Sequence, residues 1–414
     1  MRPLRPVHPV RPVRTLVVAL LLVAAPVLSA FADDTEPPAT PAATPTAAPT
    51  AVPGGDAGAG PAAYSFTPRS TLLSTDPVRA PHRITNQLVR LIDNTPPGES
   101  IEVMTYFLGS PVLKAALAAA FRRGVEVRAV FEAHTREDHR EASALGRLLN
   151  RRTTDPSWVR FTPGSTRAAG GAMHQKTWRF SRVGQARFVT VTGSYNAGDL
   201  ADSRAHSLMW QWVDEGVYDA FASVWSAQVQ MRDRAPRLRT FRGTGWTAYF
   251  SPLSARTPAG DPVLRRLAGI PANGDTVIRV AMYSMWDTRA AWIADRLAAM
   301  ARRGARVVLV AGPTVAPEVR ATMRAGGVAV YPGCFSDGTY THSKDMSASW
   351  LAGGRRQYWT WVGSDNWTTD GMASDEAVLG IRSRPMHARF LDYFERVRTR
   401  GGGVYDGACH PREG

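Results

Sequence analysis

The segment between residues 341 and 366 opens with Thr341-His342-Ser343-Lys344 and closes with Gly363-Ser364-Asp365-Asn366. The chain contains one earlier copy of both phrases, Met173-His174-Gln175-Lys176 and Gly193-Ser194-Tyr195-Asn196. The interval from His to Gly is 21 residues in the later copy and 19 in the earlier one. Two phrases and the distance between them are therefore duplicated, which predicts two structurally similar halves.

Lysine usage marks the same two places. The chain has 50 Lys plus Arg but only three lysines, at Lys114, Lys176 and Lys344, and two of the three lie two residues after a histidine. An ammonium is a compact point charge that fits close beside one phosphate oxygen, where a wide guanidinium would not. The His-x-Lys phrases therefore favour contact with a phosphate group.

The sequence around the phrases repeats as well. The expected elements of the first half are a helix at 84–92, a strand at 101–107, a helix at 112–123 and a strand at 125–131. The expected elements of the second half are a strand at 278–284, a helix at 290–303 and a strand at 305–310. Arg122-Arg123-Gly124-Val125 and Arg302-Arg303-Gly304-Ala305 occupy matching places in them. Strand-helix-strand units with short connections predict parallel strands in an α/β fold.

Both Gly-Ser phrases follow strand-like runs, at 188–192 and at 357–362. Open α/β sheets bind ligands where strands end. His174 and His342 are 168 residues apart, close to the repeat length. We expect two similar α/β halves related by a pseudo-two-fold axis, with both phrases in one cleft at their interface.

The N-terminal segment predicts export. Residues 1–32 combine four leader arginines, a largely apolar run from 15 to 31 and the small-x-small site Ala30-Phe31-Ala32, which is typical of a secretory signal peptide. The alternative is an uncleaved membrane anchor, because the run is long enough to span a bilayer. Residues 33–62 are almost entirely Pro, Ala, Thr and Gly, which predicts a disordered linker. The two halves then occupy residues 63–245 and 246–414, and we expect a secreted, extracellular protein.

The charge is strongly basic. The net charge of +15 falls to +11 without the leader arginines, and 44% hydrophobic residues supply ample material for a core. A basic surface suits polyanions such as nucleic acid, an anionic polymer or an anionic lipid surface, and it does not choose between them.

Export would place Cys334 and Cys409 in an oxidising compartment. We therefore expect one disulfide that ties the C-terminal tail to the loop before the second His phrase. Two cysteines give no metal-ligand spacing, and no Cys/His cluster supplies one, so the sequence predicts no metal and no cofactor.

With these motifs the chain resembles the HKD phospholipase D superfamily, whose pattern is His-x-Lys, four residues, Asp, and then Gly-Ser-x-Asn, present twice. The resemblance covers about 350 residues. It implies that the catalytic residues are His174, Lys176, Asn196, His342, Lys344 and Asn366. It implies supporting roles at the phosphate for Ser194, Ser364 and Glu376. This chain departs from the pattern at the motif aspartate, which is Ser181 in the first half and Ser349 in the second.

The resemblance implies that His174 is the nucleophile and His342 the general acid. If the cleft crosses the halves, Glu376 lies behind His174, where a carboxylate fixes the tautomer and leaves the other ring nitrogen free to attack. His342 would then face His206, which stands at the position corresponding to Glu376. A Ser/His/Asp triad is disfavoured, because neither Ser194 nor Ser364 lies in a Gly-x-Ser-x-Gly elbow.

The predicted function is a secreted, metal-independent phosphodiesterase of phospholipase D type that hydrolyses phospholipid headgroups through a phosphohistidine. The alternatives are a secreted nuclease on the same scaffold and a non-catalytic module that binds polyanions or membranes. Tryptophans gather around the second motif and favour lipid; they are Trp286, Trp350, Trp359, Trp361 and Trp367. The expected partners are a phospholipid or other phosphodiester, a membrane surface in peripheral contact, or nucleic acid, and we expect a monomer.

Overall fold

A computed structural model describes residues 64–135, 140–151, 154–231, 236–405 and 409. The predicted signal peptide and linker lie outside these residues. The first of three sheets has seven strands. Its strands in spatial order are β1 (Thr71–Ser74), β8 (Leu208–Val213), β6 (Ala186–Gly193), β5 (Lys176–Val183), β2 (Ser100–Thr105), β3 (Glu126–Glu132) and β4 (Trp158–Thr162).

The second sheet repeats this order with one added strand. Its strands are β13 (Ala329–Pro332), β12 (Arg306–Val315), β11 (Val277–Met285), β16 (Lys344–Ala352), β17 (Arg355–Gly363), β18 (Ala377–Arg382), β10 (Trp246–Phe250) and β9 (Arg239–Gly243). Read from opposite ends, β4-β3-β2-β5-β6-β8-β1 matches β13-β12-β11-β16-β17-β18-β10. The mixed α/β fold with two similar sheets confirms the duplication, and the expected parallel pairs, β2 with β3 and β11 with β12, are present.

The division at residue 246 does not follow the sheets. Strand β9, which the sequence places in the first half, pairs antiparallel with β10 at the edge of the second sheet. The chain therefore enters the second sheet one strand earlier than the repeat of sequence suggests.

A small third sheet joins the halves and the tail. Its strands in spatial order are β19 (Gly403–Val404), β14 (Cys334–Phe335), β15 (Tyr340–Thr341) and β7 (Ala205–His206). The predicted disulfide between Cys334 and Cys409 is confirmed, with their Cα atoms 5.6 Å apart. Both cysteines are buried.

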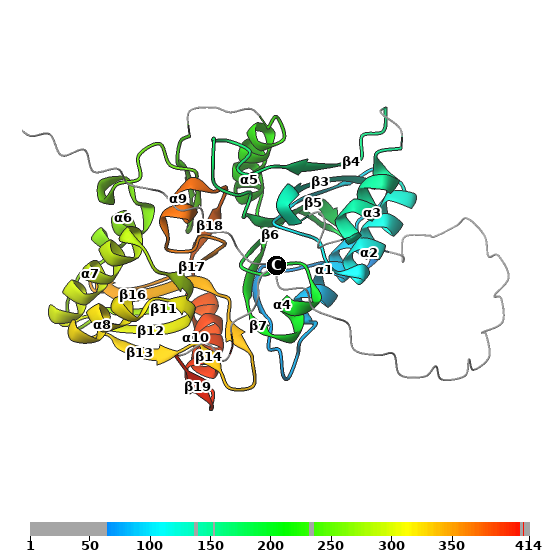
Figure 1. Ribbon diagram of the computed structural model, residues 1–414. Coiled ribbons are helices and arrows are strands. Elements are labelled where there is room, and N and C mark those ends of the chain that lie inside the picture. The colour runs from blue at the N-terminus through cyan, green and yellow to red at the C-terminus, as the bar shows by residue number, and fades with distance from the viewer. Residues whose placement is uncertain (1–63, 136–139, 152–153, 232–235, 406–408, 410–414) are drawn as a thin grey trace, which may run out of the picture. The chain divides into compact units, whose positions relative to one another are not determined.

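Helices cover the larger sheets. Those of the first half are α1 (Arg83–Asp93), α2 (Pro111–Arg122), α3 (Arg140–Leu149), α4 (Asp199–Ser203) and α5 (Glu215–Gln228). Those of the second half are α6 (Pro262–Ala268), α7 (Thr288–Arg302), α8 (Pro317–Ala325), α9 (Thr369–Ala373) and α10 (Arg384–Arg398). Two short 3₁₀ turns, η2 (Ala133–Thr135) and η3 (Pro258–Gly260), complete the set in the described residues. Helices α1 to α3 lie on one sheet and α6 to α8 on the other (Figure 1).

Local chemistry sets the ends of the matching helices α2 and α7. Ser110 accepts a hydrogen bond from the Leu113 N–H, and Asp287 caps α7 in the same way. Each helix ends before a glycine in the left-handed region, Gly124 with φ 90° and Gly304 with φ 100°. The repeated Arg-Arg-Gly phrase is thus a pair of equivalent helix stops.

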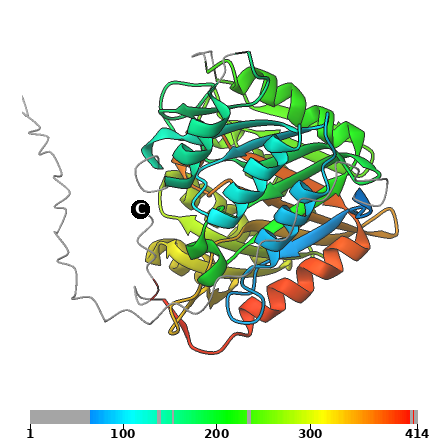
Figure 2. The same cartoon turned by 90° about the vertical axis from the view of Figure 1, so that its right-hand side faces the viewer.

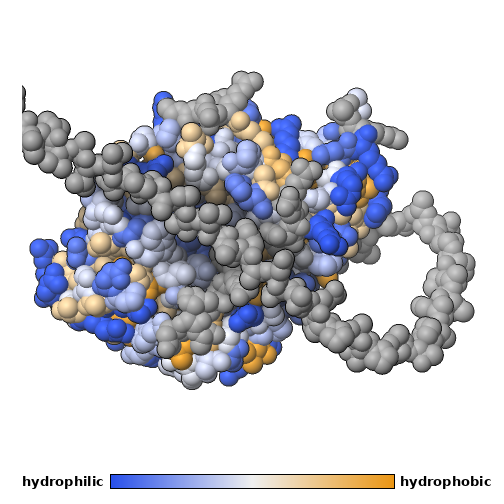
Figure 3. Space-filling model, in the orientation of Figure 1, coloured by the Kyte–Doolittle hydropathy of each residue, from blue (hydrophilic) through white to orange (hydrophobic). Residues whose placement is uncertain are grey.

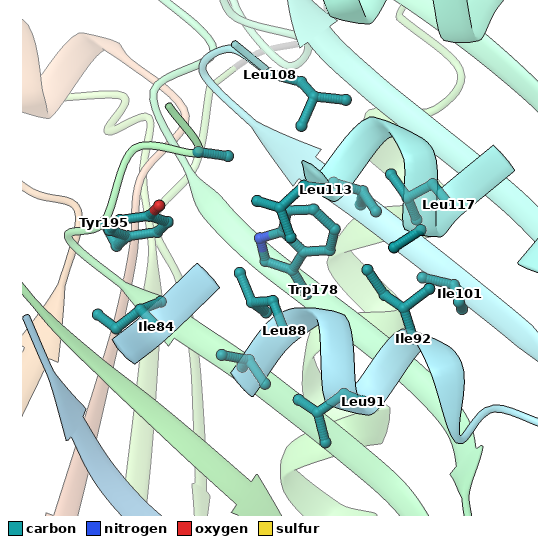
Figure 4. Close-up of a cluster of buried hydrophobic side chains, with 14 of the residues drawn as sticks. Ile84, Leu88, Leu91, Ile92, Ile101, Leu108, Leu113, Leu117, Trp178 and Tyr195 are labelled. Carbon is teal, nitrogen blue, oxygen red and sulfur yellow. The ribbon is translucent and has the colours of Figure 1, made fainter. Parts of the chain in front are cut away.

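Three layers of core hold the sheets. In the first half, Leu88, Leu117 and Trp178 meet between α1, α2 and β5 (Figure 4). A second cluster fills the space between α6 to α8 and the second sheet. A third lies between the two sheets, where the Trp210 indole donates to the Leu379 carbonyl at 2.9 Å. The two sheets therefore pack face to face around strands β6, β8, β17 and β18, with most helices outside.

The last helix of each half packs across onto the other half. Helix α5 contacts β9 and β10, and α10 contacts β1. The pairing of α10 with β1 is visible in Figure 2, with the helix in red and the strand in blue. None of the helices that the structure describes is both long and apolar enough to cross a lipid bilayer.

Candidate functional site

Equivalent strands present the repeated phrases. Lys176 is the first residue of β5 and Lys344 the first of β16, while Gly193 and Gly363 are the last residues of β6 and β17. Because β5 pairs antiparallel with β6, and β16 with β17, each His-x-Lys phrase lies at the same sheet edge as its Gly-Ser phrase. The duplicated sequence thus becomes two equivalent clusters of side chains.

Backbone contacts bring the two clusters together. The His174 N–H donates to the carbonyl of Asp375 in the other half at 3.1 Å. Reciprocally, the His342 N–H donates to the carbonyl of His206 at 2.9 Å. Each half therefore fixes the histidine backbone of the other, and a two-fold relation between halves requires reciprocal contacts of this kind.

The imidazole rings are also held from across the interface, but by different groups. His174 Nδ1 lies 2.8 Å from Glu376 Oε1, as the sequence predicted. His342 Nδ1 lies 2.9 Å from the Ser194 carbonyl oxygen. The expectation that His342 faces the His206 ring is wrong: His206 supplies its carbonyl, and its ring packs on Phe335 with centroids 5.8 Å apart.

In both histidines the supporting partner contacts the same ring nitrogen, Nδ1. A carboxylate or a carbonyl accepts a proton from Nδ1, so both rings present Nε2 away from their supporting partner. The carboxylate additionally stabilises positive charge on the His174 ring, which a neutral carbonyl does less well at His342. The site is therefore symmetric in shape and asymmetric in charge.

Glu376 is buried deeply enough to change its acidity. Burial raises the pKa of Glu376 to about 7, against the lowering effects of Lys176, the Ser364 hydroxyl and Lys344. Two lysines, one from each half, thus act on the same carboxyl. Both lysines therefore lie near enough to Glu376 to favour its charged form.

Both lysines lie folded back against their own histidine. Lys176 Nζ donates to the His174 carbonyl at 2.6 Å, and Lys344 Nζ donates to the His342 carbonyl at 2.9 Å. Lys344 Nζ also lies 3.1 Å from His342 Nε2. Both side chains are buried, which concentrates positive charge beside the imidazole rings.

Two tyrosines complete the clusters, and the sequence interpretation missed them. The Tyr106 ring meets His174 edge-on with centroids 5.2 Å apart, and Tyr283 meets His342 at 4.7 Å. The lysine Nζ atoms lie over the same rings, at 5.4 Å for Lys176 and 4.6 Å for Lys344. The signal was present as a repeated Ile-x-Val-x-x-Tyr, at 101–106 and 278–283.

The serine and asparagine of each Gly-Ser phrase have separate tasks. Ser194 Oγ accepts from the Leu208 N–H at 3.0 Å, and Ser364 Oγ accepts from the Ala377 N–H at 3.1 Å, so both hydroxyls brace the following strand. Within the described residues the side-chain Oδ1 atoms of Asn196 and Asn366 have no hydrogen-bond partner. Each of these amides also carries an Nδ2–H₂ group, which is of the type that can donate to an oxyanion.

The replaced motif aspartates lie away from this cluster. Ser181 is five residues beyond Lys176 on β5, and Ser349 is five beyond Lys344 on β16, which places each about 17 Å along its strand. Ser181 Oγ donates to Glu99 at 2.7 Å, and Ser349 is buried in the second sheet. The change from Asp to Ser therefore lies outside the cluster of His and Lys side chains.

Long-range polar networks support the variable position of each Gly-Ser-x-Asn phrase. In the second half, Arg289 pairs with Asp365 at 2.7 Å and with Asp261 at 2.7 Å, and these three side chains are buried. In the first half, the Tyr195 hydroxyl donates to Asp202 at 2.9 Å and contacts the Thr85 hydroxyl. An ionic network therefore holds the Gly-Ser-x-Asn phrase of the second half, and the hydrogen bonds of a tyrosine hydroxyl hold that of the first half.

A pocket of about 620 Å³ adjoins the second motif. Its lining includes Asn366, Tyr283, Trp286, Arg320 and Tyr405. Trp286 is 51% exposed, the largest exposed fraction among the five tryptophans that the sequence singled out. Trp361 and Trp367 are buried in the core instead, and Trp359 stacks on Trp361, so most of the cluster serves packing.

No group of three or more His, Cys, Asp or Glu in the described residues is arranged to hold a metal ion. The cationic groups of the site are its own side chains, Lys176 and Lys344.

Comparison with known proteins gives a family match and a fold match. Residues 88–227 match the family model described as cardiolipin synthase, PLD-like domain. A search of curated proteins found no match. Phosphatidylserine synthase from Haemophilus influenzae Rd KW20 superposes with a TM-score of 0.57 at 10% identity, over 80% of this chain and 86% of that one.

Two further solved structures are similar. Polyphosphate kinase from Porphyromonas gingivalis superposes with a TM-score of 0.55 at 13% identity, over 84% of this chain. The match covers 53% of that kinase, so the chain spans about half its length. Nuc from Salmonella typhimurium, a phospholipase D family member, matches 39% of this chain and 96% of that one, with 18% identity and a TM-score of 0.30.

The family match lies in the first half, which carries His174, Lys176 and Asn196, and the second half repeats both its motif and its order of strands. The chain therefore carries a PLD-like domain in its first half, and it shares the fold of the phosphatidylserine synthase and polyphosphate kinase structures.

Proposed function

We propose that the protein is a secreted, metal-independent phosphodiesterase of phospholipase D type, which hydrolyses phospholipid headgroups through a phosphohistidine. The match of residues 88–227 to a PLD-like family model supports phosphodiester-related chemistry. The observation that carries the proposal is the pair of histidines, each held at Nδ1 by the opposite half and each accompanied by a buried lysine.

In the first step, His174 Nε2 attacks phosphorus. The new N–P bond forms as the P–O bond to the leaving alcohol breaks, and His342 donates a proton to the departing oxygen. The ionised Glu376 stabilises the positive charge that the phosphorylated His174 ring acquires. Lys176, Lys344 and the two asparagine amides stabilise the negative charge on the non-bridging oxygens.

In the second step, water cleaves the intermediate. His342, now neutral, takes a proton from water as the water oxygen attacks phosphorus, and the N–P bond to His174 breaks. The products are a phosphomonoester and a free imidazole, with His342 protonated for the next cycle. Every proton in the cycle is thus carried by a residue of the site.

A charge clamp made of side chains predicts turnover that does not depend on a divalent ion. We expect the rate to be unchanged after treatment with EDTA. Loss of turnover that one added divalent ion restores would refute this part of the mechanism.

The pocket beside the second motif supports lipid as the substrate. Trp286 and Tyr405 are exposed aromatic residues close to Asn366, and amphipathic rings of this kind favour a bilayer interface. Hydrophobic residues on the face in Figure 3 lie in separate patches among hydrophilic ones, so we infer a local, peripheral membrane contact. The decisive experiment measures choline and ethanolamine release from vesicles beside cleavage of single- and double-stranded DNA.

A nuclease is the second candidate, because the net charge of +15 favours a polyanionic substrate. Cut DNA with untouched vesicles of several headgroups would establish it. Binding to either polyanion without turnover of any phosphodiester would instead identify a non-catalytic module. The basic leader at residues 1–32 supports export, which N-terminal sequencing of the protein from culture medium would test, and we propose that the protein acts as a monomer.

A further inference from the structure

A second pocket lies behind the strand that positions His342. It has a volume of about 400 Å³ and is lined by the turn after β1, by β7, by α10 and by the residues that follow α10. Figure 2 shows β1 and α10 side by side at this place. The lining includes none of the residues to which the catalytic cycle assigns a task.

The charged lining of this pocket is mainly cationic. Arg79, Arg396 and Arg400 face it together with one carboxylate, Asp76. Asp76 Oδ1 already accepts the backbone N–H groups of Val78 and Arg79, so its charge is engaged in holding the turn. Three guanidinium groups against one committed carboxylate favour an anion.

The arginines differ in how far they are engaged. Arg400 forms an ion pair with Asp337 and lies over the Phe335 ring. Arg396 reaches the Ser74 hydroxyl only at 3.5 Å, and the Arg79 side chain forms no hydrogen bond or ion pair with a described residue. Two of the three guanidinium groups thus keep most of their donors for a ligand.

His206 adds a polar group on the wall of the pocket. Its side chain is 4% exposed, and within the described residues Nε2 has no hydrogen-bond partner. Burial, with help from Arg400 and Arg396, lowers the pKa of His206 to about 4, although Asp76 and Asp337 oppose the shift. The ring is therefore neutral at pH 7 and retains an N–H to donate.

We propose that this pocket is a second anion site, which binds a phosphate group, either free or as a small phosphomonoester. A tetrahedral oxyanion matches the forked donors of Arg79 and Arg396, with Arg400 and the His206 ring as further neighbours. The volume of about 400 Å³ leaves room for an organic group on the phosphate. Anion binding at this site does not require the phosphodiesterase activity proposed above.

An anion bound in this pocket would also affect the catalytic site. The His206 carbonyl accepts the His342 N–H at 2.9 Å and the Tyr393 hydroxyl at 3.2 Å, and Tyr393 itself lines the pocket. One residue therefore faces the anion with its ring and supports a catalytic histidine with its backbone. Such a link gives two sites a shared contact through which one can influence the other.

The test is hydrogen–deuterium exchange on the purified full chain, with inorganic phosphate and glycerol 3-phosphate as probes and sodium chloride of equal ionic strength as control. We expect phosphate to slow exchange in peptides covering 74–80 and 393–402, which belong to the pocket. The phosphate concentration for half protection should rise at least tenfold in Arg79→Gln/Arg396→Gln. It should stay unchanged in Arg265→Gln, which alters an exposed arginine on α6 outside the pocket.

Both probes have defined outcomes. Half protection at a lower concentration of glycerol 3-phosphate than of phosphate would support the site and assign it to phosphomonoesters, and equal concentrations would support a site for the free anion. Protection confined to the catalytic segments around 174–176 and 342–344 would overturn the proposal. So would an unchanged midpoint in the double arginine variant, whose thermal unfolding would be compared with that of wild type.

Discussion

The two halves share an order of strands but differ in what stands behind each histidine. The second half lends a carboxylate, Glu376, to His174, whereas the first half lends only the Ser194 carbonyl to His342. A duplicated scaffold thus keeps the positions of two imidazoles while their electrostatic support diverges. Two histidines that precede matching strands can therefore differ in their electrostatic surroundings without any change in the fold.

The largest expected effect comes from removing each histidine in turn. His174→Ala should abolish turnover of every substrate, a loss on the order of 10⁵-fold, because no nucleophile remains. His342→Ala should still form the covalent intermediate with a nitrophenyl phosphodiester, whose leaving group needs no proton. Quenching without acid and mass spectrometry would locate the phosphohistidine. Finding it on His342 in the wild-type protein would reverse the roles.

The ionic network of Arg289 and the hydroxyl of Tyr195 should contribute different amounts to the free energy of unfolding. Arg289→Met leaves Asp365 and Asp261 buried without their cation, and we expect a loss of about 3–5 kcal/mol of unfolding free energy. Tyr195→Phe removes only a hydroxyl bonded to Asp202, and we expect a loss of about 1–2 kcal/mol. Urea unfolding measures both, and equal losses would show that the two phrases are supported alike.

Glu376→Gln removes the charge that distinguishes the halves while keeping the shape of the side chain. We expect the rate of phosphohistidine formation to fall roughly 10²-fold, because the amide does not stabilise a positive ring. Glu318→Gln, on the exposed surface of α8, is the matched control and should leave the rate unchanged. A full rate in Glu376→Gln would mean that the carboxylate has no part in the reaction.

The acidity of Glu376 gives the same comparison a pH dependence. Because burial raises its pKa to about 7, the active carboxylate is lost in acid, and the rate should fall about tenfold per pH unit below pH 7. The folded state holds this proton more tightly than the unfolded chain. Its contribution to stability is therefore full below the usual pKa of 4.5 and is lost as the pH rises through about 7. In Glu376→Gln, a plot of the single-turnover rate against pH should no longer show this fall below pH 7.

The smallest effect is expected at the missing motif aspartates. Ser181→Ala, about 17 Å along the strand from Lys176, should change turnover by less than about threefold. Its cost should appear in stability instead, since Ser181 accepts the Ser100 N–H at 2.8 Å and donates to Glu99. A large fall in turnover with an unchanged unfolding midpoint would show that this position acts on the reaction.

The sequence predicted which side chains cluster together where the same residue types are repeated in both halves. The duplicated His, Lys, Ser and Asn identified both motifs, and the family resemblance, with a cleft that crosses the halves, placed Glu376 behind His174. It failed at His342 because the partner is the Ser194 carbonyl, and a backbone atom leaves no mark on residue identity. The Arg289 network was equally hidden, since its partners lie 28 and 76 residues away in the chain.

The order of the strands also shows which structural features the repeat in the sequence predicts and which it does not. Matching Arg-Arg-Gly stops predicted α2 and α7 to within a few residues, because the signal is local. Strand β9 has no counterpart in the first sheet, so a comparison of the halves gave no reason to expect it. The tryptophans misled in a similar way, since burial of Trp361 and Trp367 depends on the tertiary fold.

The small sheet has a consequence for the order in which the molecule folds. It joins strands distant in sequence, with Tyr340 beside Ala205 and Cys334 beside Val404. Contacts of such long sequence separation form slowly, whereas most strands of each larger sheet come from one half. Strand β7 of this late sheet also carries the carbonyl that fixes the backbone of His342. We therefore expect catalytic competence to appear last during folding, so that a nascent chain with both halves formed is still inert toward phosphodiesters.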